Sequence, residues 1–282
     1  MKRKSKTMQS SGAKNKIIKI IFFGNGPLSE YALAALNKDY TGCEVIFHAH
    51  TKEDLAEAVR VKKENPDAHG VLASFGVLIP SSVLEVFEPE GILNIHPSLL
   101  PLYRGASPIE SAILSGDTNF GVSVMKLVKA MDAGPIYAHA TFEDAPIQNG
   151  LKDLLYRTAA EVGVSLVFSV LTAKKPVMPK PQDESKATFC GKLDKSMSVL
   201  TPETDTAEQT FRKILAFAGF PKAKYEFYGI KCIVLEAHIL EQGETAVLSL
   251  TCADGVSIAI DLLQPEGRKA MDAKSFMNGY GK

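Results

Sequence analysis

The sequence predicts an α/β protein, with a doubly wound, mainly parallel sheet followed by a small, mostly antiparallel β-barrel. Up to Leu171, short β-rich apolar runs alternate with amphipathic stretches, which is typical of strands and helices that take turns along the chain. Beyond a segment rich in proline and charge, strand-like runs follow one another and include an Asp-Gly turn. That pattern favours antiparallel pairing.

The alternation of predicted strands and helices occupies the first part of the chain, up to Leu171. Ile17–Phe23 is a continuous apolar run that ends in the turn Gly24-Asn25-Gly26-Pro27, as a buried parallel strand would. Similar runs predict strands at Glu44–Phe47, His69–Phe75, Gly91–His96 and Gly121–Val128. Apolar residues at helical spacing predict helices at Ser29–Leu36, Glu53–Glu64, Pro80–Phe87, Ser107–Ser115 and Gly150–Leu171.

The second part begins after Lys174–Lys186, where proline and charge together indicate a linker. A helix is predicted at about Thr206–Ala218, and strands at Tyr225–Leu235, Ala246–Thr251 and Val256–Leu263, the last two joined by Cys252-Ala253-Asp254-Gly255. We therefore expect a disordered basic tail over residues 1–16, an α/β domain over 17–173, a linker over 174–188 and a β-barrel domain over 189–282.

The composition limits the possible classes of function. The chain has 282 residues, 45% of them hydrophobic, which is enough for one large domain or for two ordinary domains with a core each. The 32 basic residues balance 32 acidic ones, so the whole molecule has no net charge to attract nucleic acid. The 4 cysteines include no Cys-x-x-Cys pair, which indicates reduced thiols in an intracellular protein.

No apolar run reaches the roughly 20 residues of a bilayer span, so we expect no membrane segment. We also expect a cytoplasmic protein and a monomer. The N-terminal stretch MKRKSKTMQSSGAKNK is basic but lacks the apolar core of a signal peptide. We interpret it as a tail. An RNA-contacting arm is one alternative, and a presequence for the mitochondrial matrix is a less favoured one.

Polar chemistry is concentrated at the end of the predicted strand Gly91–His96. Because side chains alternate along a strand, Leu93 and Ile95 point one way, while Asn94 and His96 point the other, at the strand's carboxyl end. Ligands bind beyond these ends in open α/β sheets. The amide can donate to a developing oxyanion, and the imidazole can hold or move a proton near neutral pH. Two polar residues that merely close a strand are the alternative.

Asp132 is the third candidate. It lies in Met131-Asp132-Ala133-Gly134-Pro135, the loop that leaves the next predicted strand, and from that strand's carboxyl end it could reach the imidazole. A carboxylate beside histidine favours the protonated ring and fixes its orientation. An aspartate that makes only a local turn is the alternative.

These residues lie in longer motifs. Asn94, the run His96-Pro97-Ser98-Leu99-Leu100-Pro101 and the run Tyr103-Arg104-Gly105-Ala106-Ser107-Pro108-Ile109 resemble the motif of the folate-dependent formyltransferases, and Met131-Asp132-Ala133-Gly134 resembles that family's aspartate loop. The continuation RGASPI, the segments Lys186-Ala187-Thr188-Phe189 and Lys192-Leu193, and the distant LQPEGRKAM at 263–271 are similar to the methionyl-tRNA formyltransferases in particular.

The resemblance implies a Rossmann-like formyltransferase domain and an OB-like, tRNA-binding C-terminal domain. It implies catalysis by Asn94, His96 and Asp132, with a folate held against the segment Ser98, Leu99, Leu100 and Pro101. The implied donor is 10-formyltetrahydrofolate, the implied acceptor is the amino group of methionine on initiator methionyl-tRNA, and no metal is needed. A proline-kinked apolar loop would suit this role, because it is a rigid wall for a flat pterin.

The chain departs from this family in two places. The segment between the second strand and Phe75-Gly76 is short, where tRNA-formylating enzymes usually have a basic inserted loop, and this leaves the mode of tRNA recognition open. Residues 189–282 contain 11 Lys+Arg against 12 Asp+Glu. Contacts to phosphate would therefore come from local clusters, such as Arg212/Lys213, Lys222/Lys224 or Arg268/Lys269.

Two other interpretations are a formyltransferase for another amine, such as an amino sugar nucleotide, and a non-catalytic folate- or RNA-binding module. Gly24-Asn25-Gly26 lacks the third glycine of a dinucleotide fingerprint, so a bound dinucleotide is not expected. His48 and His50 have no third ligand beside them in the sequence, so a bound metal ion is not expected either. Arg104 is expected either to meet phosphate or acceptor RNA, or to brace its loop by a salt bridge.

Overall fold

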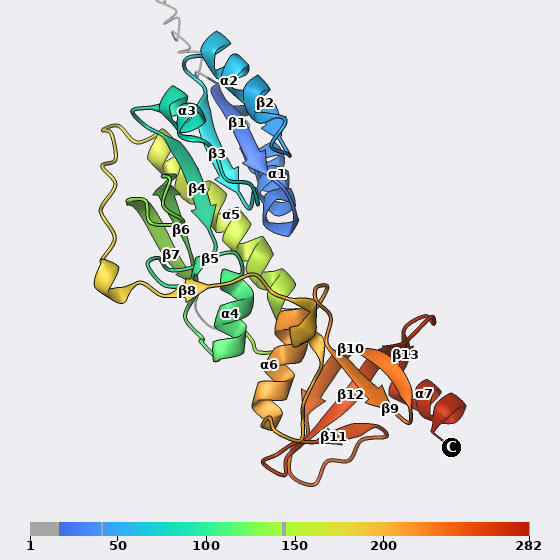
Figure 1. Ribbon diagram of the computed structural model, residues 1–282. Helices are drawn as coiled ribbons and strands as arrows, with labels where there is room; N and C mark the ends of the chain where they lie inside the picture. The colour runs from blue at the N-terminus through green and yellow to red at the C-terminus, as the bar shows by residue number, and fades with distance from the viewer. Residues whose placement is uncertain (1–16, 41, 143–144, 282) are drawn as a thin grey trace, which may run out of the picture.

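A six-stranded sheet forms the centre of the first part of the molecule (Figure 1). The computed structural model describes residues 17–40, 42–142 and 145–281, so the predicted tail over residues 1–16 lies outside the described residues. The strands, in the order β2-β1-β3-β4-β6-β7, are β1 (Ile18–Gly24), β2 (Cys43–Ala49), β3 (His69–Ala73), β4 (Ile92–His96), β6 (Phe120–Lys126) and β7 (Ile136–Phe142). The first four pair in parallel and the last two antiparallel. The predicted mainly parallel sheet is confirmed, and β7 is a strand that the sequence pattern did not reveal.

Helices cover both faces of this sheet (Figure 1). They are α1 (Pro27–Asp39), α2 (Leu55–Glu64), α3 (Ser81–Leu84), the 3-10 turn η1 (Glu85–Phe87), α4 (Pro108–Ser115) and α5 (Leu151–Leu171). Apolar residues of α1 and α5 share one core with Leu93 and Ile95 of β4. Those of α2, α3 and η1 share a second core, on the other face, with Ile92. The sheet is therefore doubly wound, as predicted.

The long helix α5 corrects one expectation from the sequence. Its 21 residues are apolar enough, by length and composition alone, to cross a membrane. In this fold, however, α5 packs against α1 and against β4, β6 and β7. At Gly163 the approach is so close that a Cβ atom would lie 2.4 Å from Cγ2 of Ile95. The apolar character of this helix thus has a structural reason, since it fills the space over the sheet.

The second part is a curled antiparallel sheet, a half-barrel, with helices at its sides (Figure 1). Its elements are α6 (Ala207–Phe217), β9 (Lys224–Phe227), β10 (Ile230–Ile239), β11 (Ser249–Thr251), β12 (Ser257–Pro265), β13 (Met271–Asp272) and α7 (Ala273–Tyr280). The strand order is β11-β12-β10-β9, with β13 paired to β12. The predicted Asp-Gly turn is confirmed, because it joins β11 to β12, and Gly255 there has a φ of 78°.

Helix α6 joins the two parts. It begins after Thr206, whose hydroxyl accepts from the Gln209 amide while the Gln209 side chain accepts from the Thr206 amide, a capping box. Its buried residues Phe211 and Ile214 belong to the same apolar cluster as Ile109 of α4 and as the half-barrel strands. The half-barrel therefore shares an apolar core with α4 of the first part.

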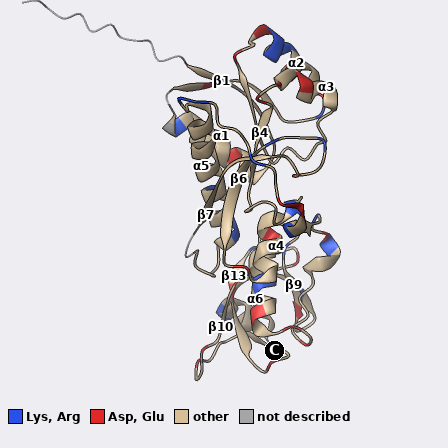
Figure 2. Cartoon of the chain, turned by 90° about the vertical axis from the view of Figure 1, so that its left-hand side faces the viewer, with Lys and Arg blue, Asp and Glu red and all other residues tan. Residues whose placement is uncertain are grey.

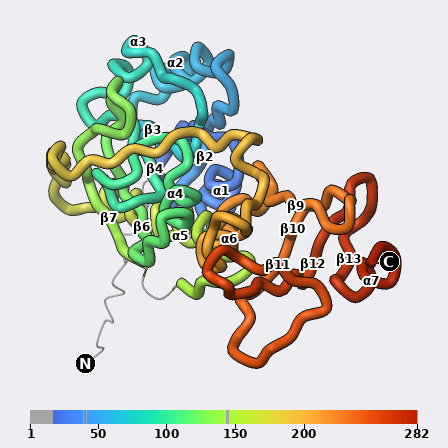
Figure 3. The backbone as a smooth tube through the Cα atoms, turned by 60° about the horizontal axis from the view of Figure 1, so that its bottom comes forward, coloured from blue at the N-terminus to red at the C-terminus, as the bar shows by residue number. Residues whose placement is uncertain are grey.

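The segment between α5 and α6 crosses the first part as an extended chain, the yellow-to-gold tube of Figure 3. We call residues 180–190 the strap. Lys180 bridges to Ile136 of β7, and β8 (Phe189–Cys190) pairs in parallel with β5 (Arg104–Gly105). Two small 3-10 turns, η2 (Glu184–Lys186) and η3 (Lys195–Ser198), lie within and after it. The later part of the predicted linker is thus fastened to the first part of the molecule by these pairings.

Candidate active site

Asn94 and His96 lie together at the carboxyl end of β4, as predicted. Their neighbours Leu93 and Ile95 pack with α1 and α5, so the alternation of the strand turns Asn94 and His96 to the opposite face. Each is only 5% exposed. A polar pair that is nearly buried at a strand end is shielded from water, and this raises the strength of its interactions with anything that enters.

The contacts of His96 fix where its proton resides. Nε2 lies 3.0 Å from the carbonyl oxygen of Tyr103. A carbonyl can only accept, so Nε2 carries the hydrogen and donates it. Nδ1 lies 3.7 Å from Oδ1 of Asp132, with both side chains largely buried. Nδ1 is therefore the nitrogen at which this ring can take up or release a proton, and a carboxylate faces it.

Asp132 is held in an uncommon backbone conformation, with a φ of 48°. Its Oδ2 accepts a hydrogen bond of 2.8 Å from the amide of Gly105. Gly105 has a φ of 128°, and a Cβ atom there would lie 1.9 Å from the carbonyl oxygen of Cys190. Only glycine fits between Asp132 and the strap, which explains the glycine that follows Arg104 in the motif.

The route by which Asp132 reaches His96 differs from the expected one. Because β6 runs antiparallel to β4, Ser123 pairs with His96 and Lys126 pairs with Leu93. The carboxyl end of β6 thus lies beside the start of β4, not beside its end. Residues 127–135 fold back over the sheet to bring Asp132 to the imidazole. The predicted approach of Asp132 to His96 is present, but the predicted strand direction is wrong.

The Ser98–Pro101 segment is fastened from beneath by Ser123, a residue that the sequence analysis missed. The Ser123 hydroxyl donates to the Ser98 carbonyl oxygen at 2.8 Å and accepts from the Leu100 amide at 3.1 Å. Ser98 Oγ in turn donates to the Leu102 carbonyl oxygen at 2.7 Å. A serine with 0% exposure inside an apolar strand was the available signal, since a buried hydroxyl needs partners.

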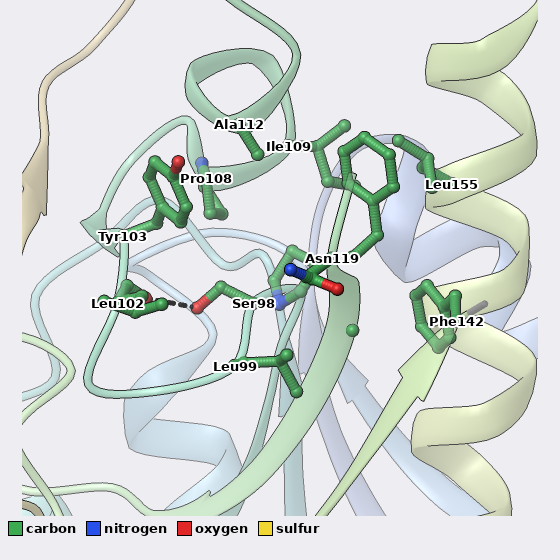
Figure 4. Close-up of a pocket in the computed structure, with 13 residues that line it drawn as sticks. Ser98, Leu99, Leu102, Tyr103, Pro108, Ile109, Ala112, Asn119, Phe142 and Leu155 are labelled. Atoms are coloured by element: carbon green, nitrogen blue, oxygen red, sulfur yellow. Dashed lines mark hydrogen bonds between the residues drawn. The ribbon is translucent and has the colours of Figure 1, made fainter. Parts of the chain in front are cut away.

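The apolar pocket in Figure 4 lies on one side of this segment. It is lined by Ser98 and Leu99 together with Tyr103, Ile109 and Phe142. Its volume is only about 20 Å³, which is room for one water molecule. It includes none of Asn94, His96 or Asp132. In this form of the molecule the pocket is too small for a folate, and the proposed folate contact with Ser98–Pro101 stays a prediction.

Arg104 braces the strap. Arg104 is 2% exposed, and its guanidinium makes two hydrogen bonds of 2.8 Å to the carboxylate of Glu184. Those bonds lower the pKa of the Glu184 carboxyl. Of the two expectations for Arg104, a phosphate contact or a salt bridge within the protein, the structure has the salt bridge. The guanidinium also lies against the ring of Phe189, whose centroid is 6.0 Å away.

Comparisons with known proteins agree with this fold. The family described as formyl transferase matches residues 37–171, and its C-terminal domain matches residues 192–281. A methionyl-tRNA formyltransferase of Dictyoglomus thermophilum is 34% identical over 236 residues, which are 78% of this chain and 74% of that protein. One from Thermus thermophilus is 34% identical over 265 residues, 90% of this chain and 82% of that protein.

Solved structures share the fold at lower identity. The methionyl-tRNA formyltransferase from Clostridium thermocellum superposes with a TM-score of 0.65 at 17% identity, covering 88% of this chain and 98% of that one. HypX from Aquifex aeolicus, in complex with tetrahydrofolic acid, gives a TM-score of 0.72 at 18% identity over 95% of this chain. This chain spans about half of HypX, 48% of its length.

The fold, the polar cluster and these matches define the class of protein: the chain belongs to the formyl transferase family, so it is an enzyme that transfers formyl groups. Within that family, the two curated relatives above are methionyl-tRNA formyltransferases, and both are matched over most of their length. The resemblance found in the motifs is confirmed.

Proposed function

We propose that this enzyme transfers the formyl group of 10-formyltetrahydrofolate to the amino group of methionine on initiator methionyl-tRNA, for translation initiation. The observation that carries the proposal is the nearly buried cluster of Asn94, His96 and Asp132 at the end of β4. The identity of 34% to methionyl-tRNA formyltransferases over most of the chain supports the choice of acceptor.

The proposed reaction is an attack of the amine nitrogen on the formyl carbon. The carbonyl oxygen gains negative charge as the new carbon–nitrogen bond forms. The amide of Asn94 donates a hydrogen bond to that oxygen, and the positive charge of a protonated His96 stabilises it. The bond to N10 of the folate then breaks, N10 takes up a proton, and the former amine gives one up. One proton leaves and one arrives, so the exchange is balanced.

Asp132 sustains the charged form of His96 in this proposal. Because Nε2 is committed to the Tyr103 carbonyl, the second proton of the ring must be on Nδ1, facing the carboxylate. A carboxylate at this distance stabilises the imidazolium and can pass the amine's proton onward. The other oxygen of Asp132, which accepts from Gly105, keeps the carboxylate in place.

The folate is proposed to lie against Ser98, Leu99, Leu100 and Pro101. The hydrogen bonds of Ser98 and Ser123 make this segment rigid, which favours binding of a flat ring because little flexibility is lost. The catalytic candidates all come from one copy of the chain, so we propose that a monomer suffices. We place the reaction in the cytoplasm, away from membranes.

Recognition of tRNA cannot rely on a broadly basic surface. Figure 2 shows basic and acidic residues interspersed along the described chain of both parts. Among the predicted clusters, Arg212 pairs with Glu208 and Lys213 with Asp205. The remaining candidates are exposed: Lys222, Lys224, Arg268 and Lys269. We propose that they contact the phosphates of the tRNA.

One assay tests the proposed function. The purified protein receives 10-formyltetrahydrofolate together with charged initiator tRNA, charged elongator methionyl-tRNA or a free amino sugar nucleotide. We expect the initiator tRNA to be formylated faster than the elongator methionyl-tRNA and the amino sugar nucleotide. Formylation of the amino sugar alone would establish the alternative acceptor, and binding of folate without any product would establish a non-catalytic module.

A further inference from the structure

Gln182 connects the strap to the loop that holds Asp132. Its Nε2 donates to the carbonyl oxygen of Asp132 at 2.8 Å and to that of Gly134 at 2.7 Å. Its Oε1 accepts from Nε of Arg104 at 3.1 Å and from Nη2 at 2.8 Å. Both hydrogens of Nε2 and both lone pairs of Oε1 are thus used. With the amide turned around, its NH2 group would face the N–H groups of Arg104, and its oxygen would face the two carbonyl oxygens. The side chain has one arrangement.

The other side of this contact is also fixed. Arg104 is buried and is held by two hydrogen bonds to Glu184, itself in the strap. The strap is tied to the same region a second time by the pairing of β8 with β5. Gln182 is therefore presented to the loop by a rigid support, which is what a residue must have to position another.

The loop needs such support because its central residue is under strain. Asp132 has a φ of 48°, a conformation that is unfavourable for a non-glycine residue and persists only where its surroundings hold it. The two carbonyl groups that Gln182 binds are those of Asp132 and of Gly134, on either side of Ala133. Gln182 thus clamps the backbone of the strained turn, while the Gly105 amide holds the carboxylate.

We propose that Gln182 is a positioning residue for catalysis: it keeps the Asp132 carboxylate facing Nδ1 of His96. The residue lies in what the sequence presents as a linker, and it reaches the reaction only through Asp132. This inference rests on the proposed role of Asp132 in formyl transfer. It makes the strap a working part of the active site as well as a connection between the two parts of the chain.

The kinetic test uses Gln182→Glu, whose carboxylate still accepts from Arg104 but repels the two carbonyls. Gln182→Met tests the same contact without added charge, should the first variant fold poorly. We expect kcat to fall about 10-fold to 100-fold, with the KM values for folate and tRNA nearly unchanged. Asp183→Asn is the matched control, because that exposed neighbour contacts only Ser185 and Lys186, and its activity should equal that of the wild type.

A double-mutant cycle separates positioning from a general structural role. If Gln182 acts through Asp132, Gln182→Glu should change kcat less than about 2-fold in an Asp132→Asn background. An equal loss in both backgrounds would overturn the proposal. The proposal would also be overturned if the fall in kcat were fully explained by a smaller fraction of folded protein.

Hydrogen exchange gives a readout that does not depend on activity. The Gly105 amide donates to Asp132, so its exchange should become faster in Gln182→Glu and stay unchanged in Asp183→Asn. Unchanged protection of Gly105 in Gln182→Glu would refute the positioning role. If the wild type formylates no acceptor, the proposed function fails, and this measurement still decides whether Gln182 holds the loop.

Discussion

Lys152 of α5 and Glu110 of α4 form an ion pair with Nζ 3.1 Å from Oε1, and both side chains are largely buried. The same ammonium donates to the carbonyl oxygens of Ala216, Ala218 and Phe220, at and beyond the end of α6. Helix ends leave such carbonyls without partners in the helix, and a cation there is favourable. One lysine therefore joins two helices of the first part to the helix that carries the half-barrel.

Lys152→Met should destabilise the protein by about 3–5 kcal/mol, because it leaves the Glu110 charge buried without its partner. Chemical denaturation gives the free energy of unfolding. The double variant Lys152→Met/Glu110→Gln should recover part of the loss. Lys63→Met, on the exposed side of α2, is the control and should change stability by less than about 0.5 kcal/mol. A similar small effect at Lys152 would show that the buried pair does not hold the parts together.

Asn94→Ala, His96→Ala and Asp132→Ala should each lower kcat by about 100-fold to 1,000-fold, because each removes a group that acts on the developing oxyanion or sustains one that does. Single-turnover formylation at saturating donor and acceptor measures the chemical step. The exposed histidine of β7 offers a control, since His139→Ala should keep full activity. Near-normal rates in all three variants would remove these residues from the mechanism.

Gly105→Ala should cost both stability and activity. The new Cβ would lie 1.9 Å from the Cys190 carbonyl oxygen, at a φ of 128°, so β5 and β8 must separate and the amide must leave Asp132. We expect a loss of about 2–4 kcal/mol. Gly191→Ala, one residue beyond β8, is matched to it, because a Cβ there has no atom within 4 Å. Equal midpoints of thermal unfolding for the two variants would contradict this account.

The sequence predicts the positions of residues in the fold well where local patterns determine them. Asn94 and His96 stand out because period-two alternation separates them from Leu93 and Ile95, and that separation is confirmed by the core contacts of the strand. Helix α6 is predicted to within a residue at each end, and its start is fixed by a local capping box of Thr206 and Gln209. In both cases the deciding interactions lie within a few residues of one another.

The features that the sequence did not predict depend on contacts between segments that are distant in the chain. Strand β6 pairs antiparallel with both β4 and β7, so the path of the Asp132 loop depends on strand pairing that the local pattern of β6 does not give. Gln182 lies 50 residues from Asp132 in sequence and sits in a segment whose composition indicates a linker. No local pattern marks a side chain whose partners are backbone carbonyls brought near by the fold.

His238 gives the half-barrel a pH-dependent contact. Its Nδ1 lies 2.8 Å from Asp261 and its Nε2 lies 3.2 Å from Glu244. The hydrogen bond to Asp261 is the main cause that raises the pKa of His238 above its ordinary value of 6.5. A raised folded pKa means that the stabilisation is fully present below pH 6.5 and is lost as the pH rises through the folded pKa.

We therefore expect the difference in unfolding free energy between the wild type and His238→Gln to be larger at pH 6 than at pH 9. Urea titrations at several pH values measure it. His139→Gln, at an exposed position, corrects for any general effect of pH on histidine variants. A difference that is the same across the range would mean that the two carboxylates do not stabilise the charged ring.

The half-barrel should bind tRNA through one face of its sheet. Lys224 of β9 pairs with Ile233 of β10, and Ile233 pairs with Gln264 of β12, so the three side chains share a face. Gln264 also holds the turn that carries Arg268, by donating to its carbonyl oxygen at 2.9 Å. Lys224 and Arg268 are both exposed. Lys224 and the turn of Arg268 therefore offer exposed cations beside this face, whereas Arg212 and Lys213 have carboxylate partners.

Lys224→Ala/Arg268→Ala should raise the KM for tRNA and leave kcat at saturating tRNA unchanged, because the two cations bind phosphate away from the reacting atoms. The slope of log affinity against log salt concentration should fall by about 1 for each phosphate that the variant no longer binds. Arg212→Ala/Lys213→Ala should change that slope little, since those charges are already neutralised within the protein. If Arg212→Ala/Lys213→Ala changed the KM for tRNA and the salt slope more than Lys224→Ala/Arg268→Ala, the tRNA would instead bind on the α6 side of the half-barrel.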